Sequence, residues 1–411
     1  MSLAIEAIEA TEILDSRGNP TVSAAVRLAN GITGEASVPS GASTGRHEAV
    51  ELRDHDPRRY AGRGVLRAVA NVNQILATEL RGMTADRQAD IDRRMIELDG
   101  TPDKSRLGAN AILAVSCAVA RAAAASRRML LWRYLAEGRR AVLPVPMVNI
   151  FSGGLHAGGR IEFQDFLVIP HGFASYAQAL EAIVQVHRAA HRVIEERGLV
   201  LTGVADEGGW GPRFSSNEQA LALLCEAIQG MQMSIAIDAA STHFYRDGVY
   251  TLASEGRALS SAEMAALLER WISQYPVVSI EDPLSEDDWD GWRSLTASLG
   301  NRVQLIGDDL FATNLDRLNR GIASGVANAV LVKMNQAGTL TETFAVIDRA
   351  REAGYRAIIS ARSGETEDDF LADLAVASGA GQIKVGSVRT SERLAKYNRL
   401  LKLEGEVAFG D

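Results

Sequence analysis

The chain of 411 residues has little cysteine, a deficit of positive charge and no long apolar run. Its two cysteines, Cys117 and Cys225, stand in helix-like contexts, so we expect reduced core thiols. A net charge of −9 argues against nucleic acid or an anionic membrane as a partner. No apolar run approaches the roughly 20 residues that span a bilayer. Glu6 and Glu9 interrupt the first apolar stretch, which argues against a secretory signal, so we predict a cytoplasmic protein.

Lysine is also scarce. Only five of the 43 basic residues are lysines, namely Lys104, Lys333, Lys384, Lys396 and Lys402. Where the chain needs only a positive charge, it uses arginine. An amine can lose its proton, whereas a guanidinium effectively cannot. We therefore expect a lysine at a strand end to have a role that arginine cannot fill.

Residues 1–140 predict an α+β domain. Alternating apolar residues on both sides of Asn30-Gly31 predict a β-hairpin. We predict one long Ala-rich helix over residues 109–136. The proline-containing stretch LPVPMV that follows marks the expected boundary with the second domain.

Residues 141–411 contain eight short apolar runs, each ending in polar residues, with amphipathic helical stretches between most of them. From the run that ends at Glu281 onward, the spacing matches one strand-helix unit. We predict an α/β fold in which an N-terminal α+β domain caps a C-terminal (β/α)8 barrel, with the active site at the carboxyl ends of the strands. A doubly wound open sheet is the alternative, but no Gly-rich dinucleotide motif follows a strand.

The residues at the ends of these runs would share one barrel mouth. They are Glu207, Asp238, Glu281, Asp308, Lys333, Arg362 and Lys384. Three successive strands supply Asp238, Glu281 and Asp308, an all-oxygen set that suits Mg²⁺. No histidine or cysteine stands at the end of a predicted strand, which argues against zinc. The alternative is that each carboxylate caps the following helix, but the two facing lysines favour a metal site.

Lys333 is the predicted general base. A nearby divalent cation and Lys384 would favour its deprotonated form. For Lys384, a simpler role as an anion clamp stays open. A base beside a metal predicts proton abstraction next to a carboxylate, with the metal stabilising the enediolate.

Ordered motifs along nearly the whole chain resemble those of the enolase family. They are EILDSRGNPTV (12–22), VPSGASTG (38–45), LGANAILAVS (107–116), LPVPMVNI (143–150), DEGG (206–209), SIEDP (279–283), GDDLFATN (307–314), KMNQAGTL (333–340), RSGETED (362–368) and GQIK (381–384). The resemblance implies a Mg²⁺-dependent hydro-lyase with an enolase-type barrel and at least a homodimer.

The resemblance also implies a role for each matching residue. The metal ligands would be Asp238, Glu281 and Asp308 for a first Mg²⁺ and Ser43 for a second. Lys333 would take the C2 proton of the substrate, and Glu207 would act as the acid for the leaving hydroxide. The small phosphorylated or phosphonylated acid would be bound by His156, Gln164, Asp165, Arg362, Ser363 and Lys384.

Three positions depart from the family pattern, all in the walls around the substrate. Ala361 stands where enolases have a substrate-facing histidine, Asp165 where they have a glutamate near the leaving hydroxyl, and Leu155 where a polar or small residue is usual. The first hypothesis is a lyase acting on 2-phosphoglycerate or a close analogue. The second is a homologue from phosphonate metabolism, similar to carboxyphosphonoenolpyruvate synthase, with a bulkier phosphorus substituent. The third is a non-catalytic binding or structural protein.

Overall fold

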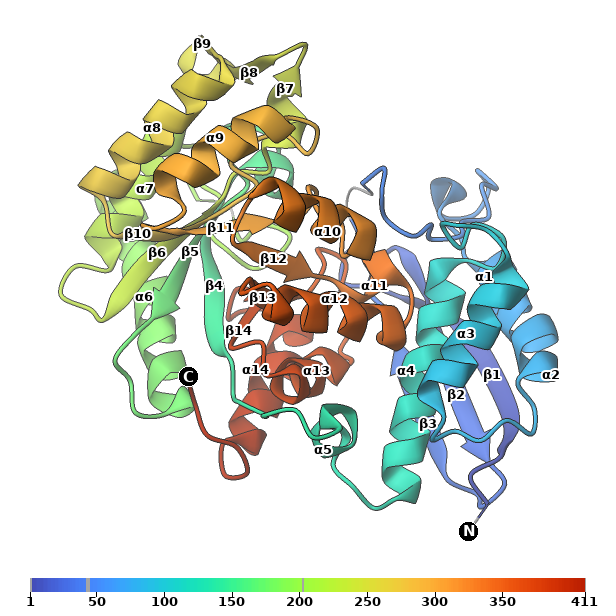
Figure 1. Ribbon diagram of the computed structural model, residues 1–411. Helices are drawn as coiled ribbons and strands as arrows, with labels where there is room; N and C mark the ends of the chain where they lie inside the picture. Colours follow the sequence, from blue (N-terminus) through green and yellow to red (C-terminus); the bar gives the residue numbers. More distant parts are fainter. Residues whose placement is uncertain (1, 42–44, 202, 411) are drawn as a thin grey trace.

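The computed structural model describes residues 2–41, 45–201 and 203–410. Figure 1 shows an antiparallel sheet with its helices on one side of the molecule and a helix-ringed barrel on the other. The sheet has the order β1-β2-β3, formed by β1 (Ile5–Leu14), β2 (Pro20–Leu28) and β3 (Thr33–Ser37). The predicted turn joins β2 to β3, and Gly31 adopts a φ of +83°, a conformation that glycine tolerates readily.

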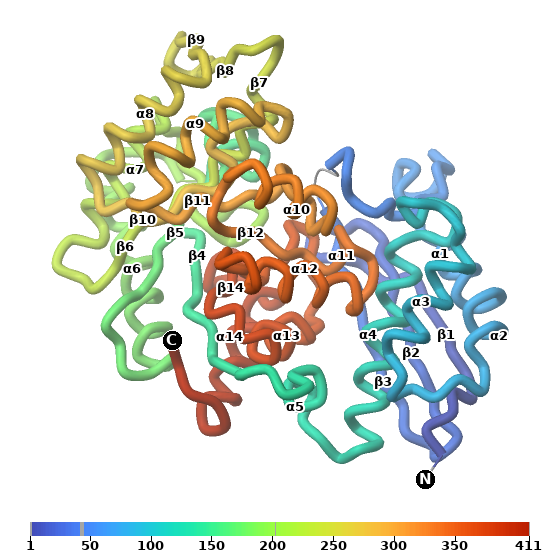
Figure 2. The backbone as a smooth tube through the Cα atoms, viewed as in Figure 1, coloured from blue at the N-terminus to red at the C-terminus, as the bar shows by residue number. Residues whose placement is uncertain are grey.

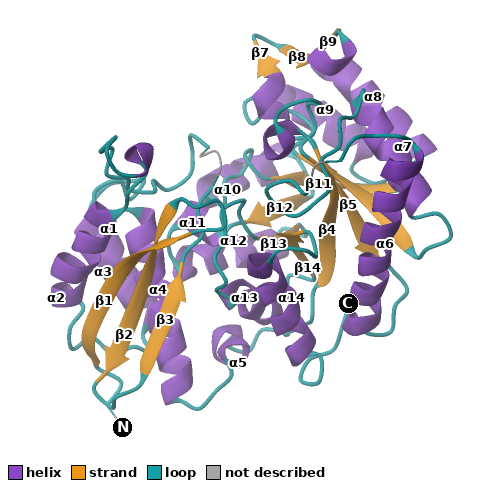
Figure 3. Cartoon of the chain, turned by 180° about the vertical axis from the view of Figure 1, so that it is seen from behind, coloured by secondary structure: helices purple, strands orange, loops and turns teal. Residues whose placement is uncertain are grey.

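Helix α4 (Ala109–Ser126) packs against β2 and β3 on one side and against α11 and α12 of the barrel on the other (Figure 3). Its approach to β3 is so close that a Cβ on Gly34 would lie 2.3 Å from the backbone nitrogen of Ala122. By length and composition alone α4 could cross a membrane, but 83% of it is buried inside the protein. It is therefore accounted for as a core helix. The other helices before the barrel are η1 (Tyr60–Gly62), α1 (Leu66–Ala70), η2 (Asn71–Leu76), α2 (Ala77–Glu79), α3 (Gln88–Asp99) and α5 (Leu131–Ala136).

The single helix predicted over residues 109–136 is wrong. Helix α4 ends at Ser126, and α5 begins separately at Leu131. Arg128 adopts a φ of +55°, which no α-helix accommodates and which turns the chain between the two helices.

The predicted barrel is confirmed as a closed sheet in the order β10-β11-β12-β13-β14-β4-β5-β6. One predicted strand is wrong, because the run near Glu207 forms a turn-rich connection. The stretch predicted to be a boundary supplies β4 instead. The strands are β4 (Val145–Ser152), β5 (Asp165–Pro170), β6 (Met233–Asp238), β10 (Val277–Glu281), β11 (Gln304–Gly307), β12 (Ala329–Val332), β13 (Arg356–Ser360) and β14 (Gln382–Gly386).

Strand β5 runs antiparallel to both of its neighbours, unlike the other barrel strands. Its first residue, Asp165, therefore lies level with Asp238 at the end of β6, and Asp238 pairs with Glu281 at the end of β10. This register brings three acidic residues to one level of the barrel.

Below that level the barrel is filled by apolar side chains and is not a pore. The inner cluster consists of Met147, Leu167, Ile169, Ala236, Ile306, Ala329, Leu331 and Ile358. Such packed layers are typical of eight-stranded barrels and hold the strand ends rigidly.

The outer ring consists of helices that pack on the barrel strands. They are α6 (Tyr176–Glu196), α7 (Asn217–Ala227), α8 (Ser261–Gln274), α9 (Trp289–Leu299), α10 (Leu315–Ser324), α11 (Met334–Ala337), α12 (Leu340–Glu352), α13 (Phe370–Ser378) and α14 (Ser391–Leu403). A small sheet, β7 (Tyr245–Arg246), β8 (Val249–Leu252) and β9 (Arg257–Leu259), follows β6. Short 3₁₀ segments are η3 (Gly154–Ala157), η4 (Ser241–Phe244) and η5 (Ala253–Glu255). The C-terminal segment returns to the neighbourhood of α6 (Figure 2). There Phe409 packs edge-on against Tyr176.

The loop after β3 joins the N-terminal part to the barrel mouth. Ser40 and Gly364 exchange two backbone hydrogen bonds of 2.7 and 2.9 Å, next to the end of β13. The amide of Ala49 donates to the carbonyl of Gln336 in α11. The N-terminal part thus contributes side chains from this loop to the barrel mouth.

Candidate active site

A cavity opens at the barrel mouth, where the sequence predicted the site. It is lined by the predicted residues Leu155, His156, Gln164, Glu207, Asp238, Asp308, Lys333, Ala361, Arg362, Ser363 and Lys384. Glu281 and Asp165 lie beside the cavity rather than in its lining, with exposed fractions of 2% and 0%. Segments far apart in the sequence therefore meet here as predicted.

Two lysines face the three predicted metal ligands. Lys384 Nζ lies 2.8 Å from Asp238 Oδ2 and 2.7 Å from Glu281 Oε2. Lys333 Nζ lies 2.5 Å from Asp308 Oδ2. All three carboxylates are less than a tenth exposed, so these are buried ion pairs, in which removing one partner is strongly destabilising.

The electrostatics of the cluster reflect burial and crowding. Burial, together with the neighbouring Asp238 carboxylate, raises the pKa of Glu281 well above its usual value. Burial lowers the pKa of Lys384, but Asp238 and Glu281 outweigh it and raise the pKa well above normal. Burial also lowers the pKa of Lys333, but Asp308 outweighs it, so this amine stays protonated in the state described. The sequence predicted a deprotonated Lys333. The difference arises because the ammonium donates directly to Asp308.

Arg362, which the family resemblance implies would act with Ser363 as a clamp for the substrate phosphate, is 5% exposed and pairs with a carboxylate of the N-terminal loop. Its Nη1 donates to Glu48 Oε2 at 2.8 Å and to Asn335 Oδ1 at 3.0 Å. Burial lowers the pKa of Arg362, but Glu48 outweighs it and raises the pKa. The backbone amide of Arg362 donates to Glu365, which fixes the segment after β13. A carboxylate therefore sits at this clamp, which is built to hold an anion.

His156 lies between two carboxylates on the opposite wall. Its Nδ1 is 2.9 Å from Asp165 Oδ2, and its Nε2 is 3.8 Å from Glu207 Oε1. Burial lowers the pKa of His156, but Asp165 and Glu207 outweigh it and raise the pKa to about 9. Burial raises the pKa of Glu207, but His156 and further cations outweigh it and lower the pKa. In this state the proton therefore resides on His156 and Glu207 is ionised.

The sequence did not identify several other residues of the lining. Glu48, His243 and Asp309 also face the cavity. Asp309 stands beside Asp308 in the GDD triplet, and this doublet was a usable signal. Nothing in the sequence distinguishes Glu48 or His243 from other loop residues.

Two family models match the chain. One described as "Enolase, C-terminal TIM barrel domain" matches residues 140–410, and one described as "Enolase, N-terminal domain" matches residues 5–135. The chain belongs to the enolase family. A protein named enolase from Acidothermus cellulolyticus is 55% identical over 409 residues, which cover 98% of this chain and 94% of that relative.

Membership of the enolase family makes the chain an enolase-type hydro-lyase, so the non-catalytic hypothesis is set aside. The similarity gives no support to the predicted alternative role in phosphonate metabolism. The chemistry of the donor set fits the magnesium of enolases, because three buried carboxylates offer only hard oxygen ligands. Asp282 supports this set, since its carboxylate accepts the backbone amides of Asp308 and Asp309 at 2.9 and 2.8 Å.

The departures from the enolase pattern lie where the chain wraps around the cavity. Ala361 lines it with a methyl group, and Leu155 stands in η3 with 54% of its surface exposed. Asp165 lies behind His156, on the side away from the cavity. Ser43, the predicted ligand of a second ion, lies outside the described residues.

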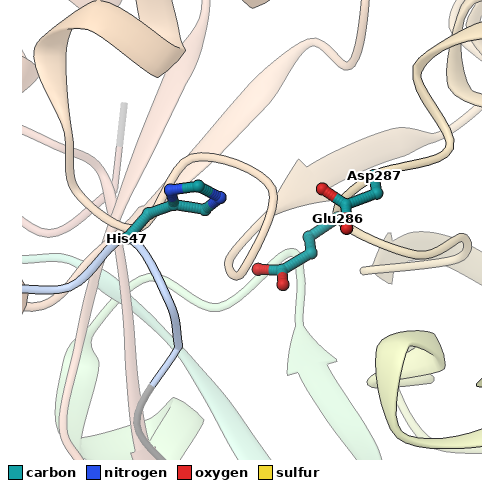
Figure 4. Close-up of side chains that lie close together, drawn as sticks. All are labelled: His47, Glu286 and Asp287. Carbon is teal, nitrogen blue, oxygen red and sulfur yellow. The ribbon is translucent and has the colours of Figure 1, made fainter.

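A separate cluster of His47, Glu286 and Asp287 also offers potential metal-ligand atoms, within 4.8 Å of one another (Figure 4). Arg46 donates to both carboxylates, with Nη2 3.2 Å from Glu286 Oε1. The two acidic side chains are therefore already paired. We describe the cluster as an ion-pair contact between the N-terminal loop and the segment after β10.

Proposed function

We propose that this enolase-type lyase converts 2-phosphoglycerate, or a close analogue, into a phosphoenolpyruvate-type product in a Mg²⁺-dependent reaction. The observation that carries the proposal is one arrangement at the barrel mouth. Two lysines and a buried arginine surround three buried carboxylates, each on a different strand end. This set can bind a trianionic substrate, remove a proton and stabilise the resulting charge.

Lys333 removes the C2 proton as a neutral amine, after its ammonium has left Asp308 and lost its proton to solvent; a nearby divalent cation and Lys384 would favour this neutral form. On the opposite wall the hydroxide leaves C3 as water, and the proton comes from the His156–Glu207 pair, in which His156 supplies the proton that Glu207 passes on as the acid. Two bound Mg²⁺ ions, one on Asp238, Glu281 and Asp308 and one involving Ser43, would supply positive charge for the substrate carboxylate as the enediolate forms. The aligned strand ends hold these groups in fixed positions, so little reorganisation is needed during the reaction.

Arg362 and Ser363 bind the phosphate, and Lys384 binds the carboxylate side of the substrate. Glu48 must leave Arg362 for a phosphate to take its place, since both anions require the same guanidinium. His156 and Gln164 complete the polar wall. Because Ala361 has a smaller side chain than histidine, it leaves more space beside the phosphate. The proposal therefore includes a close analogue with a larger substituent on phosphorus.

The test is to mix the purified protein with Mg²⁺ and 2-phosphoglycerate and to follow phosphoenolpyruvate by its ultraviolet absorbance. We expect product from the parent protein and a 10²–10⁴-fold lower rate from Lys333→Ala. Lys402→Ala is the matched control, because Lys402 is an exposed lysine at the end of α14. Equal rates for Lys333→Ala and the parent would contradict the assigned base. A parent that forms no product from 2-phosphoglycerate would contradict this substrate.

We also propose a homodimer or higher homo-oligomer and a cytoplasmic location, as the family resemblance implies. Light scattering of the purified protein measures the oligomeric state directly. A monomer at micromolar concentration would contradict it.

A further inference from the structure

Asp165 is a buried carboxylate whose described hydrogen-bond partners are all donors. Its Oδ1 accepts from Asn149 Nδ2 at 2.5 Å and from Ser152 Oγ at 3.0 Å. Its Oδ2 lies 2.9 Å from His156 Nδ1. The residue is 0% exposed and is not part of the cavity lining. Both oxygens are thus engaged by side chains of the wall, and neither faces the space where a substrate binds.

This geometry determines which ring nitrogen of His156 carries a hydrogen. Burial is the main influence on Asp165 and raises its pKa, whereas the charge of His156 and the hydrogen bond with it favour the ionised form. The donors Asn149 and Ser152 also favour a carboxylate. An ionised carboxylate has no hydrogen to donate, so its 2.9 Å contact with Nδ1 of His156 requires that Nδ1 carry the hydrogen. The ring is then oriented with Nε2 toward Glu207 and the cavity.

His156 has acidic neighbours on several elements. Asp165 on β5, Glu207 in the connection between α6 and α7, and Asp238 on β6 favour the imidazolium. His243, on η4, also faces the cavity; burial lowers the pKa of His243, and the imidazolium of His156 contributes to this lowering. The positive charge of His156 is therefore held beside Glu207 by a carboxylate that the substrate does not reach.

We propose that Asp165 is a positioning residue that fixes His156 with Nδ1 protonated and Nε2 aimed at Glu207, so that the three side chains act as a unit during the departure of hydroxide. The family resemblance predicted Asp165 beside the leaving group itself. The geometry assigns it one position further back, acting through His156. The catalytic part of this proposal rests on the proposed function, whereas the positioning of His156 does not.

The positioning is tested by the titration of His156, followed by NMR of protein with ¹⁵N-labelled histidine in the presence of Mg²⁺. The chain has seven histidines, and the His156 signal is assigned by its loss in His156→Gln. In the parent we expect His156 to stay charged to about pH 9 with a protonated Nδ1. In Asp165→Asn the amide can donate to Nδ1, which inverts the tautomer and lets the ring become neutral at a lower pH than in the parent. Asp165→Glu keeps the carboxylate and should keep the charged ring.

A His156 that titrates near pH 6.5 in the parent would overturn the proposal, and this measurement needs no variant of Asp165. An unchanged titration in Asp165→Asn would overturn it as well. In the kinetic arm we expect Asp165→Asn to lower kcat for 2-phosphoglycerate at least tenfold with KM within threefold, and Asp165→Glu to restore most of kcat. Equal kcat in the parent and Asp165→Asn would overturn the catalytic part. If the parent does not turn over 2-phosphoglycerate, the proposed substrate fails, while the titration still decides the role of Asp165.

Discussion

Arg393 on α14 offers a test of how the proposed phosphate clamp, Arg362 and Ser363, is held. Its side chain is 0% exposed and donates to three backbone carbonyls. Nη1 lies 2.6 Å from the carbonyl of Arg362 and 3.0 Å from that of Val385, and Nη2 lies 2.6 Å from the carbonyl of Ser363. One guanidinium thus fixes the backbone of both clamp residues and of β14. We expect Arg393→Lys to weaken both the fold and substrate binding.

The magnitude follows from the hydrogen bonds that a lysine cannot replace. A single ammonium on a shorter reach keeps about one of the three contacts, so about two are lost. Hydrogen bonds to a charged group contribute roughly 1.5–3 kcal/mol each, so the free energy of unfolding should fall by about 3 kcal/mol or more. At roughly 2 °C per kcal/mol for a domain of this size, Tm falls by about 6 °C. A displaced Arg362 should also raise KM for the phosphorylated substrate about tenfold or more.

The assays are thermal unfolding and steady-state kinetics at saturating Mg²⁺. Lys402→Gln is the control on the same helix, because its side chain is exposed and its effect should stay within about 0.5 kcal/mol. If Arg393→Lys matches this control in both Tm and KM, Arg393 does not hold Arg362 and Ser363 in place.

Three further predictions follow from the site and its surroundings. Burial lowers the pKa of His187 to about 4 from 6.5. The contribution of neutral His187 to the free energy of unfolding is therefore complete above pH 6.5 and is lost as the pH falls toward 4. This is about 3 kcal/mol, which thermal melting should show as a steeper acid loss in the parent than in His187→Gln. Mg²⁺ at about 100 times its Kd should stabilise the parent by about 2.7 kcal/mol, and this gain in Tm should shrink in Asp308→Asn. An equal gain in that variant would contradict the assigned ligand. Ala361→His should raise kcat/KM for 2-phosphoglycerate at least tenfold, and an unchanged value would show that the methyl group does not limit this substrate.

The scarcity of lysine drew attention to Lys333 and Lys384, but it could not distinguish these two from lysines with a structural role. Lys104 and Lys396 are also buried, 5% and 1% exposed, and serve the fold. Lys104 pairs with Glu342, and Lys396 pairs with Glu365 and donates to the carbonyl of Thr366. A compact ammonium suits each of these confined sites. Composition could therefore indicate that a lysine is special without indicating whether its role is catalytic or structural.

The strand ends could be predicted because a barrel brings the ends of separate apolar runs to one mouth. Strand β4 could not be predicted in this way. When only neighbouring residues are considered, Pro144 and Pro146 are typical of a boundary between domains. Strand β4 is defined by long-range pairing, with Val145 opposite Gln382 and Leu143 bridged to Phe409 at the other end of the chain. The reversed direction of β5 likewise depends on tertiary pairing, and it determines where Asp165 lies. The contact between Glu48 and Arg362 arises from the docking of one domain on the other.

We propose above that Lys333 removes the C2 proton at a magnesium site built from three strand-end carboxylates. The most direct test of this proposal is the exchange of the C2 proton of 2-phosphoglycerate in deuterated water, measured by NMR with Mg²⁺ present. We expect exchange with the parent protein and a rate that is about 10²–10⁴-fold lower in Lys333→Ala. Exchange at the parent rate in Lys333→Ala, or no exchange with the parent protein, would contradict the proposal.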